Sequence, residues 1–161
     1  MNVTLDECFQ FGLGAFETIG IEQGIPILLD KHLKRLERAA DFLKLGSLSE
    51  RGITGRKIEK YLEEQKMRTE VQKEFGNLEH CALKIMLTKE NMVYSLRANH
   101  YTPEKYEKGF FIDISAVKRN ETSPLVYHKT MNYGDCILEK RKATAAGMDE
   151  RLFLNTKEQV S

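Results

Sequence analysis

The spacing of hydrophobic residues changes several times along the chain, and the first clear pattern is a strict alternation over residues 15–21. In this stretch Phe16 falls on one face, while Glu17, Ile19 and Ile21 fall on the other. Alternation with period two is typical of a half-buried strand. We therefore expect a strand in which a single carboxylate shares the face of two isoleucines.

Short apolar runs predict the remaining strands. Gly24 is suited to a hairpin turn, with residues 26–29 as the returning strand. Further strands are expected at residues 81–88, 92–98, 110–117 and 150–155.

Helical spacing predicts a helix over residues 31–45, with Asp30 as its N-cap and Gly46 at its end. Leu33 and Leu36 belong to its apolar stripe. Residues 54–76 read as one or two charged helices, and shorter helices are expected at residues 103–108 and 133–146.

Segment 118–125 has the polar and proline-containing composition of a linker. It predicts a first domain over residues 1–117 and the beginning of a second over residues 126–161. A chain of 161 residues is long enough to bury a core in either one large or two small domains.

Composition excludes several classes of function. The 25 Lys and Arg residues nearly balance the 24 Asp and Glu residues, which argues against nucleic acid or an anionic membrane as a partner. No apolar run reaches the roughly 20 residues that cross a bilayer. Cys8, Cys81 and Cys136 are widely spaced, which favours reduced thiols in the cytoplasm and gives no metal-binding pattern.

Two cationic residues are candidates for chemistry. Lys129 lies in the run V-Y-H-K-T-M-N-Y just before a predicted helix, and a lysine with a neutral amine is a nucleophile for carbonyl carbon. Arg35 lies beside the apolar stripe of its helix, so its guanidinium either points into a cleft or remains at the surface. Local context leaves both alternatives open.

Three blocks of the sequence resemble the class IV aminotransferase family of pyridoxal-phosphate enzymes. They are F-G-L-G-A-F-E-T-I, then L-L-D-K-H-L-K-R-L-E-R-A-A, and much later H-K-T-M-N-Y-G-D-C-I-L-E-K-R. The resemblance implies an α+β fold, with a small N-terminal α/β sandwich domain and the beginning of a larger β-rich C-terminal domain that is incomplete here.

The resemblance also implies roles for individual residues. Lys129 matches the lysine that forms the Schiff base with pyridoxal 5'-phosphate and shuttles the substrate proton. Arg35 matches the arginine that grips the cofactor phosphate, which suits its planar fork of donors. Tyr133 matches a tyrosine near the cofactor, and Phe16 belongs to the F-E pair near the wall of the active site.

The family contains both lyases and aminotransferases. The motif F-E-T-I and the R-A-N-H-Y-T-P-E-K-Y block look more like 4-amino-4-deoxychorismate lyase, which releases pyruvate to give 4-aminobenzoate for folate synthesis. Arg97 and His100 resemble the pair that holds the substrate carboxylate in D-amino-acid enzymes, with one extra residue between them. A branched-chain or D-amino-acid aminotransferase therefore stays open as the alternative.

Members of the family continue beyond the position of Ser161 with a glutamate that pairs with the cofactor's pyridine nitrogen. We therefore expect this chain to be C-terminally truncated and to bind the cofactor weakly or not at all. The resemblance also implies a homodimer acting on a small amino substrate. An inactive, dimerising remnant of the family is the non-enzymatic alternative.

Overall fold

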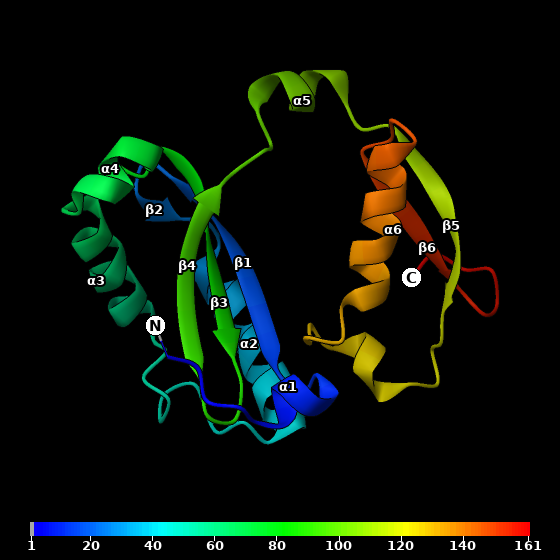
Figure 1. Cartoon of the computed structure of the whole chain (residues 1–161), viewed down its shortest axis with the longest axis horizontal. Helices are drawn as coiled ribbons and strands as arrows, with labels where there is room; N and C mark the ends of the chain where they lie inside the picture. The colour runs from blue at the N-terminus through cyan, green and yellow to red at the C-terminus, as the bar shows by residue number, and fades with distance from the viewer. Residues whose placement is uncertain (1) are drawn as a thin grey trace. The chain divides into compact units, whose positions relative to one another are not determined.

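The computed structural model describes residues 2–161, and these divide into two compact units. The first comprises residues 2–99 together with His128–Met131, and the second comprises His100–Tyr127 with Asn132–Ser161. Figure 1 shows the helices and strands of each unit. Lys129 thus belongs to the same unit as the N-terminal strands, although more than 100 residues separate them in sequence.

A four-stranded antiparallel sheet forms the framework of the first unit, in the order β2-β1-β3-β4. Its strands are β1 (Ala15–Glu22), β2 (Ile25–Pro26), β3 (His80–Leu87) and β4 (Met92–Ala98). In the centre β1 pairs with β3 over all eight residues of each strand, from Ala15 opposite Leu87 to Glu22 opposite His80. This long pairing fixes which side chains of the two strands share a face.

Three helices of the first unit are α2 (Leu29–Leu43), α3 (Gly55–Lys66) and α4 (Thr69–Phe75), and α2 runs along one face of the sheet (Figure 1). The core lies on this face, because Ile19, Leu36 and Leu83 are all 1% exposed or less. The alternation along β1 and the helical stripe of α2 turn the apolar residues of the two elements toward each other. Packing α2 on the sheet therefore buries the apolar side chains of both elements.

The N-terminal segment is fastened to the β3–β4 turn by one buried carboxylate. Asp6 caps the short helix α1 (Glu7–Phe11) through Cys8 N and accepts hydrogen bonds from Thr88 Oγ1 and Asn91 Nδ2. The Thr88 hydrogen bond is the main cause that lowers the pKa of Asp6. Helix α1 is absent from the sequence-based prediction because five residues are too few to show a helical period.

The second unit consists of α5 (Pro103–Lys108), β5 (Ile112–Arg119), the 3-10 turn η1 (Pro124–Tyr127), α6 (Gly134–Ala145) and β6 (Glu150–Asn155). β5 and β6 pair in parallel. The predicted linker at 118–125 therefore begins inside a paired strand and lies within this unit. Its Asn and Pro residues form a loop and a turn, but the chain packs as one unit on both sides of them.

Several predicted boundaries are wrong in detail. The cap of α2 is Leu28 in a left-handed conformation, and Asp30 lies inside the first turn, where a negative charge is favourable. The helix ends at Leu43, and its C-cap Lys44, also left-handed, lies two residues before Gly46. The strand expected at 26–29 is shortened to Ile25–Pro26, because the chain enters α2 at once.

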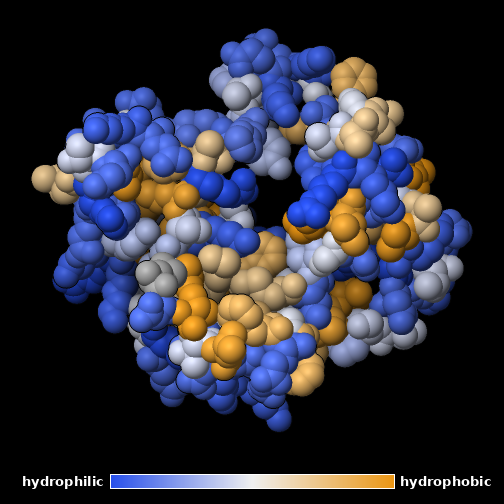
Figure 2. Space-filling model, viewed as in Figure 1, coloured by the Kyte–Doolittle hydropathy of each residue, from blue (hydrophilic) through white to orange (hydrophobic). Residues whose placement is uncertain are grey.

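The predicted α+β class is confirmed, since both units mix helices and strands. Figure 2 shows apolar patches on a largely hydrophilic surface, and exposed phenylalanines contribute to the apolar surface, among them Phe9, Phe11 and Phe111. Within residues 2–161, no helix combines the length and hydropathy that crossing a membrane requires.

Candidate active site

The segment that carries Lys129 lies beside the beginning of β1. Met131 N–H donates to the carbonyl of Gly14 at 2.7 Å, and Phe16 N–H donates to the carbonyl of Lys129 at 3.2 Å. Ala15 and Thr130 form an antiparallel bridge between these two bonds. Residues 128–131 therefore extend the sheet at the edge of β1, which brings Lys129 next to Phe16.

Gly14 permits this close approach. A Cβ atom at this position would lie 2.7 Å from Cys8 Sγ, 3.0 Å from Met131 Cγ and 3.2 Å from the carbonyl oxygen of Leu87. These distances are shorter than ordinary van der Waals contacts, so a larger residue forces the neighbouring segments apart. Gly14 of the F-G-L-G-A-F motif thus leaves room for Cys8 of α1, for Leu87 of β3 and for Met131 of the segment that carries Lys129.

The amine of Lys129 lies over the ring of Phe16, with Nζ 4.4 Å from the ring centroid. Lys84 Nζ lies 5.0 Å from the same centroid. Phe16 itself is only 7% exposed, so its ring is a fixed surface for both amines. Such cation–π contacts contribute about 0.5–2 kcal/mol each, depending on how far the amine is desolvated. Phe16 therefore links the predicted catalytic lysine to the central strand.

On the other face of β1, Glu17 binds Arg35 and His32 of α2. Arg35 Nε and Nη2 donate to Glu17 Oε1 and Oε2 at 2.5 and 2.6 Å, and His32 Nδ1 lies 2.8 Å from Oε2. The Glu17 side chain is 1% exposed, whereas that of Arg35 is 46% exposed. Burial raises the pKa of Glu17, but the hydrogen bonds from Arg35 and His32 outweigh burial, so its pKa lies below the usual range.

Adjacent residues of one strand therefore contact both predicted cofactor residues. Phe16 contacts Lys129 on one face of β1, and Glu17 contacts Arg35 on the other. Both contacts lie near the N-terminal end of the strand, where residues 128–131 form the neighbouring edge. A lysine amine and an arginine fork have the donor chemistry that suits the aldehyde and the phosphate of pyridoxal phosphate, although the two side chains contact opposite faces of β1.

Arg97 shares a sheet face with Lys84 and Phe16. It lies on β4 opposite Ala82, two residues along from the Ser95–Lys84 pair, and side chains two residues apart on a strand point to the same side. The predicted substrate residue Arg97 is thus on the Phe16 side of the sheet. His100, its predicted partner, belongs to the second unit.

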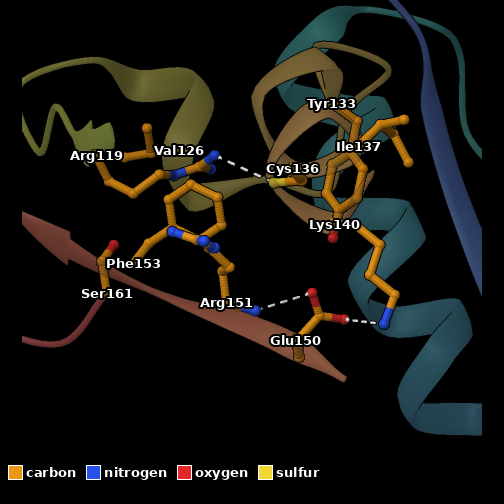
Figure 3. Close-up of a pocket in the computed structure, with 10 residues that line it drawn as sticks. All are labelled: Arg119, Val126, Tyr133, Cys136, Ile137, Lys140, Glu150, Arg151, Phe153 and Ser161. Atoms are coloured by element: carbon orange, nitrogen blue, oxygen red, sulfur yellow. Dashed lines mark hydrogen bonds and ion pairs between the residues drawn. The ribbon is translucent and has the colours of Figure 1, made fainter. Parts of the chain in front are cut away.

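Tyr133 precedes α6 and lines a cavity of about 510 Å³ in the second unit (Figure 3). Burial raises the pKa of Tyr133, and the nearby thiol of Cys136 raises it further. In the same cavity Arg119 Nη1 lies 3.5 Å from Cys136 Sγ, and Arg151 Nε is buried with no hydrogen-bond partner among residues 2–161. The predicted site residues are therefore distributed over both units.

Two of these contacts were not expected from the sequence. The sequence gives no reason to single out Lys84, and it assigns Glu17 only to the F-E pair near the wall of the active site, although the alternation of residues 15–21 places Glu17 with two isoleucines. A carboxylate in such a row needs a charged partner, and His32 and Arg35 are three residues apart on one face of the predicted helix. The alternation of residues 15–21 and the spacing of His32 and Arg35 therefore could have predicted the Glu17 cluster. No sequence pattern indicated that Lys84 contacts Phe16.

Comparisons with known proteins identify the family. The family model described as amino-transferase class IV matches residues 14–161, and the chain belongs to this family. Over 40 residues, a quarter of this chain and 14% of the relative, it is 48% identical to aminodeoxychorismate lyase of Bacillus subtilis (strain 168).

Solved structures agree with this fold. A crystal structure of 4-amino-4-deoxychorismate lyase from Pseudomonas aeruginosa superposes with a TM-score of 0.69 at 20% identity, covering 99% of this chain and 60% of that one. An aminotransferase from Brucella abortus bound to the cofactor PLP also gives 0.69 at 20% identity, with 100% and 60% coverage. The chain thus spans about 60% of the length of these solved relatives.

Proposed function

We propose that this chain carries the lysine-bearing part of the active site of a pyridoxal-phosphate-dependent 4-amino-4-deoxychorismate lyase. One observation carries the proposal: Lys129 contacts Phe16, and Arg35 is hydrogen-bonded to Glu17, the next residue of the same strand. The local identity to the Bacillus subtilis lyase favours this reaction within the family.

Each residue has a distinct task in this proposal. Arg35 binds the cofactor phosphate with its planar donors, and Lys129 attaches the cofactor and moves the substrate proton at its Nζ. Tyr133 lies at the cofactor, while Arg97 and His100 bind a substrate carboxylate. When bound, the cofactor acts as an electron sink, which eases the loss of pyruvate and leaves 4-aminobenzoate.

The first experiment tests the cofactor lysine. The chain is incubated with pyridoxal phosphate, reduced with borohydride, and digested for peptide mass spectrometry, which detects weak attachment as well as strong. We expect the label on Lys129, and its loss in Lys129→Ala. Lys84→Ala is the matched control, because Lys84 contacts the same ring at a similar distance. Label on Lys84 alone, or on many surface lysines equally, contradicts the assignment.

The second experiment separates the two reactions of the family. Release of pyruvate from 4-amino-4-deoxychorismate without any added keto acid supports the lyase. An amino transfer that requires a keto-acid acceptor supports an aminotransferase instead, the activity named for the Brucella abortus protein. Sedimentation at several concentrations tests the proposed homodimer.

A further inference from the structure

Glu17 lies on the buried face of β1, where an apolar side chain is the usual choice. It belongs to the same face of β1 as Ile19 and Ile21, which are fully buried, and its own residue exposure is 0%. An ionised carboxylate in this row is costly unless charged donors satisfy it. Both donors come from α2, at His32 and Arg35, three residues apart in that helix.

The contact fixes the orientation of a guanidinium group. Arg35 uses one edge of its fork, Nε and Nη2, to bind the two oxygens of Glu17. His32 Nδ1 contacts Oε2 of Glu17, the oxygen that also accepts from Nη2 of Arg35, and so limits sideways rotation of the carboxylate. A bidentate pair of planar groups fixes the plane as well as the distance. The arginine is therefore anchored at one edge by a buried group, while its side chain as a whole is half exposed.

We propose that Glu17 is a positioning residue that orients Arg35 for binding a phosphate monoester, with His32 as its second support. This inference rests on the proposed role of Arg35 toward the cofactor phosphate and adds the residue through which that role is achieved. Displacements of about 1 Å in a binding group are enough to weaken recognition strongly.

The test uses a change that keeps the charge. Glu17→Asp retains the carboxylate but withdraws it by one methylene, so any loss of phosphate binding reports position rather than charge. Inorganic phosphate is titrated into the chain, and the Nε–H signal of Arg35 is followed by ¹H–¹⁵N NMR. We expect phosphate to bind about fivefold or more weakly to Glu17→Asp than to the wild type.

Glu22→Asp is the matched control. Glu22 lies on the same strand and meets His80 Nδ1 at 2.8 Å, the same distance as the Glu17–His32 contact. Both side chains of this pair are more than one-third exposed, and within residues 2–161 the ion pair of Glu22 is with His80 and not with an arginine. We expect this variant to bind phosphate like the wild type. Circular dichroism confirms that each variant is folded at the temperature of the titration.

A further variant separates positioning from simple electrostatics. Glu17→Gln removes a negative charge beside Arg35, so a purely electrostatic effect predicts tighter phosphate binding, whereas positioning predicts weaker binding. Equal or tighter binding in both Glu17→Asp and Glu17→Gln overturns the positioning role and leaves Arg35 as the phosphate group. If phosphate leaves the Arg35 signal of the wild type unchanged, the phosphate role of Arg35 itself is wrong.

Discussion

The two ends of β1 each carry a glutamate bound to a histidine, and the two pairs differ in burial. Glu17 meets His32 and Glu22 meets His80, each at 2.8 Å from Nδ1 to a carboxylate oxygen. The Glu17 side chain is 1% exposed, while that of Glu22 is 44% exposed. Distance alone therefore does not distinguish a pair that anchors a site from one at the surface.

The difference comes from what surrounds each carboxylate. Glu17 faces α2 and the apolar core, so water cannot replace its protein partners, and Arg35 adds two short charge-assisted bonds. Glu22 and His80 exchange their contact readily for water, and exposed ion pairs contribute only about 0–1 kcal/mol. We conclude that the N-terminal end of β1 carries the buried pair and the C-terminal end the hydrated pair, and the predictions below compare the two ends.

The largest effect is expected from removing the buried carboxylate. Glu17→Ala leaves a cavity in the row of Ile19 and removes both acceptors of Arg35. We expect a loss of about 2–4 kcal/mol in the free energy of unfolding, below the upper range for buried pairs because Arg35 is partly hydrated. Glu22→Ala is expected to change it by about 0.5 kcal/mol or less. Urea unfolding followed by circular dichroism measures both, and equal losses would remove the distinction between the ends.

A glycine pair on the same segment gives the second comparison. An Ala at Gly14 meets Cys8, Met131 and the Leu87 carbonyl within 3.2 Å, so we expect Gly14→Ala to cost about 1–3 kcal/mol. Apart from its chain neighbours, no atom of residues 2–161 lies within 4 Å of a Cβ at Gly20, and Gly20→Ala is expected to stay within about 0.5 kcal/mol of the wild type. Thermal unfolding of the two variants tests this. A harmless Gly14→Ala would mean that Cys8, Met131 and Leu87 do not pack as closely around Gly14 as these distances indicate.

Acid provides a third comparison, between the wild type and Glu17→Gln. The pKa of Glu17 is lowered in the fold by hydrogen bonds that exceed the opposing effect of burial. A lowered pKa contributes stability that is fully present above the unfolded value of 4.5 and is lost as the pH falls through the folded pKa. The stability difference between the two proteins should therefore shrink as the pH falls from about 7 to about 3. A difference that is constant over this range contradicts an ionised Glu17.

Much of this end of the molecule was predictable from sequence, and the reason is periodicity. Alternation over residues 15–21 placed Glu17 beside Ile19 and Ile21, and helical spacing placed Arg35 at the edge of its stripe. The main strands follow from the same local patterns, whereas the α+β class was implied by the family resemblance. Local patterns determine which face a residue occupies, because a strand and a helix each have a fixed period.

Contacts between distant segments were not predictable in this way. Nothing in the pattern of residues 128–131 indicates that they pair with the edge of β1, and the proximity of Lys84 to the ring of Phe16 depends on the β1–β3 register. The resemblance to a family suggested roles for Lys129 and Arg35, but not the two residues that hold them. Pairing between segments far apart in sequence depends on how the whole core packs, so a short stretch of sequence does not predict it.

The smallest expected effect separates the two histidines. Ionised Glu17 only accepts hydrogen bonds, so His32 Nδ1 must be the protonated nitrogen in the contact at 2.8 Å. His32→Ala removes this donor, and we expect a loss of about 0.5–1.5 kcal/mol, reduced slightly by the better helix propensity of Ala. The amide nitrogen of Asn approximates Nδ1, so His32→Asn should recover part of the loss. His80→Ala should change stability by about 0.3 kcal/mol or less, because its partner Glu22 is hydrated. Urea titrations of the three variants decide the matter: if His80→Ala costs as much as His32→Ala, burial is not what distinguishes the two ends of β1.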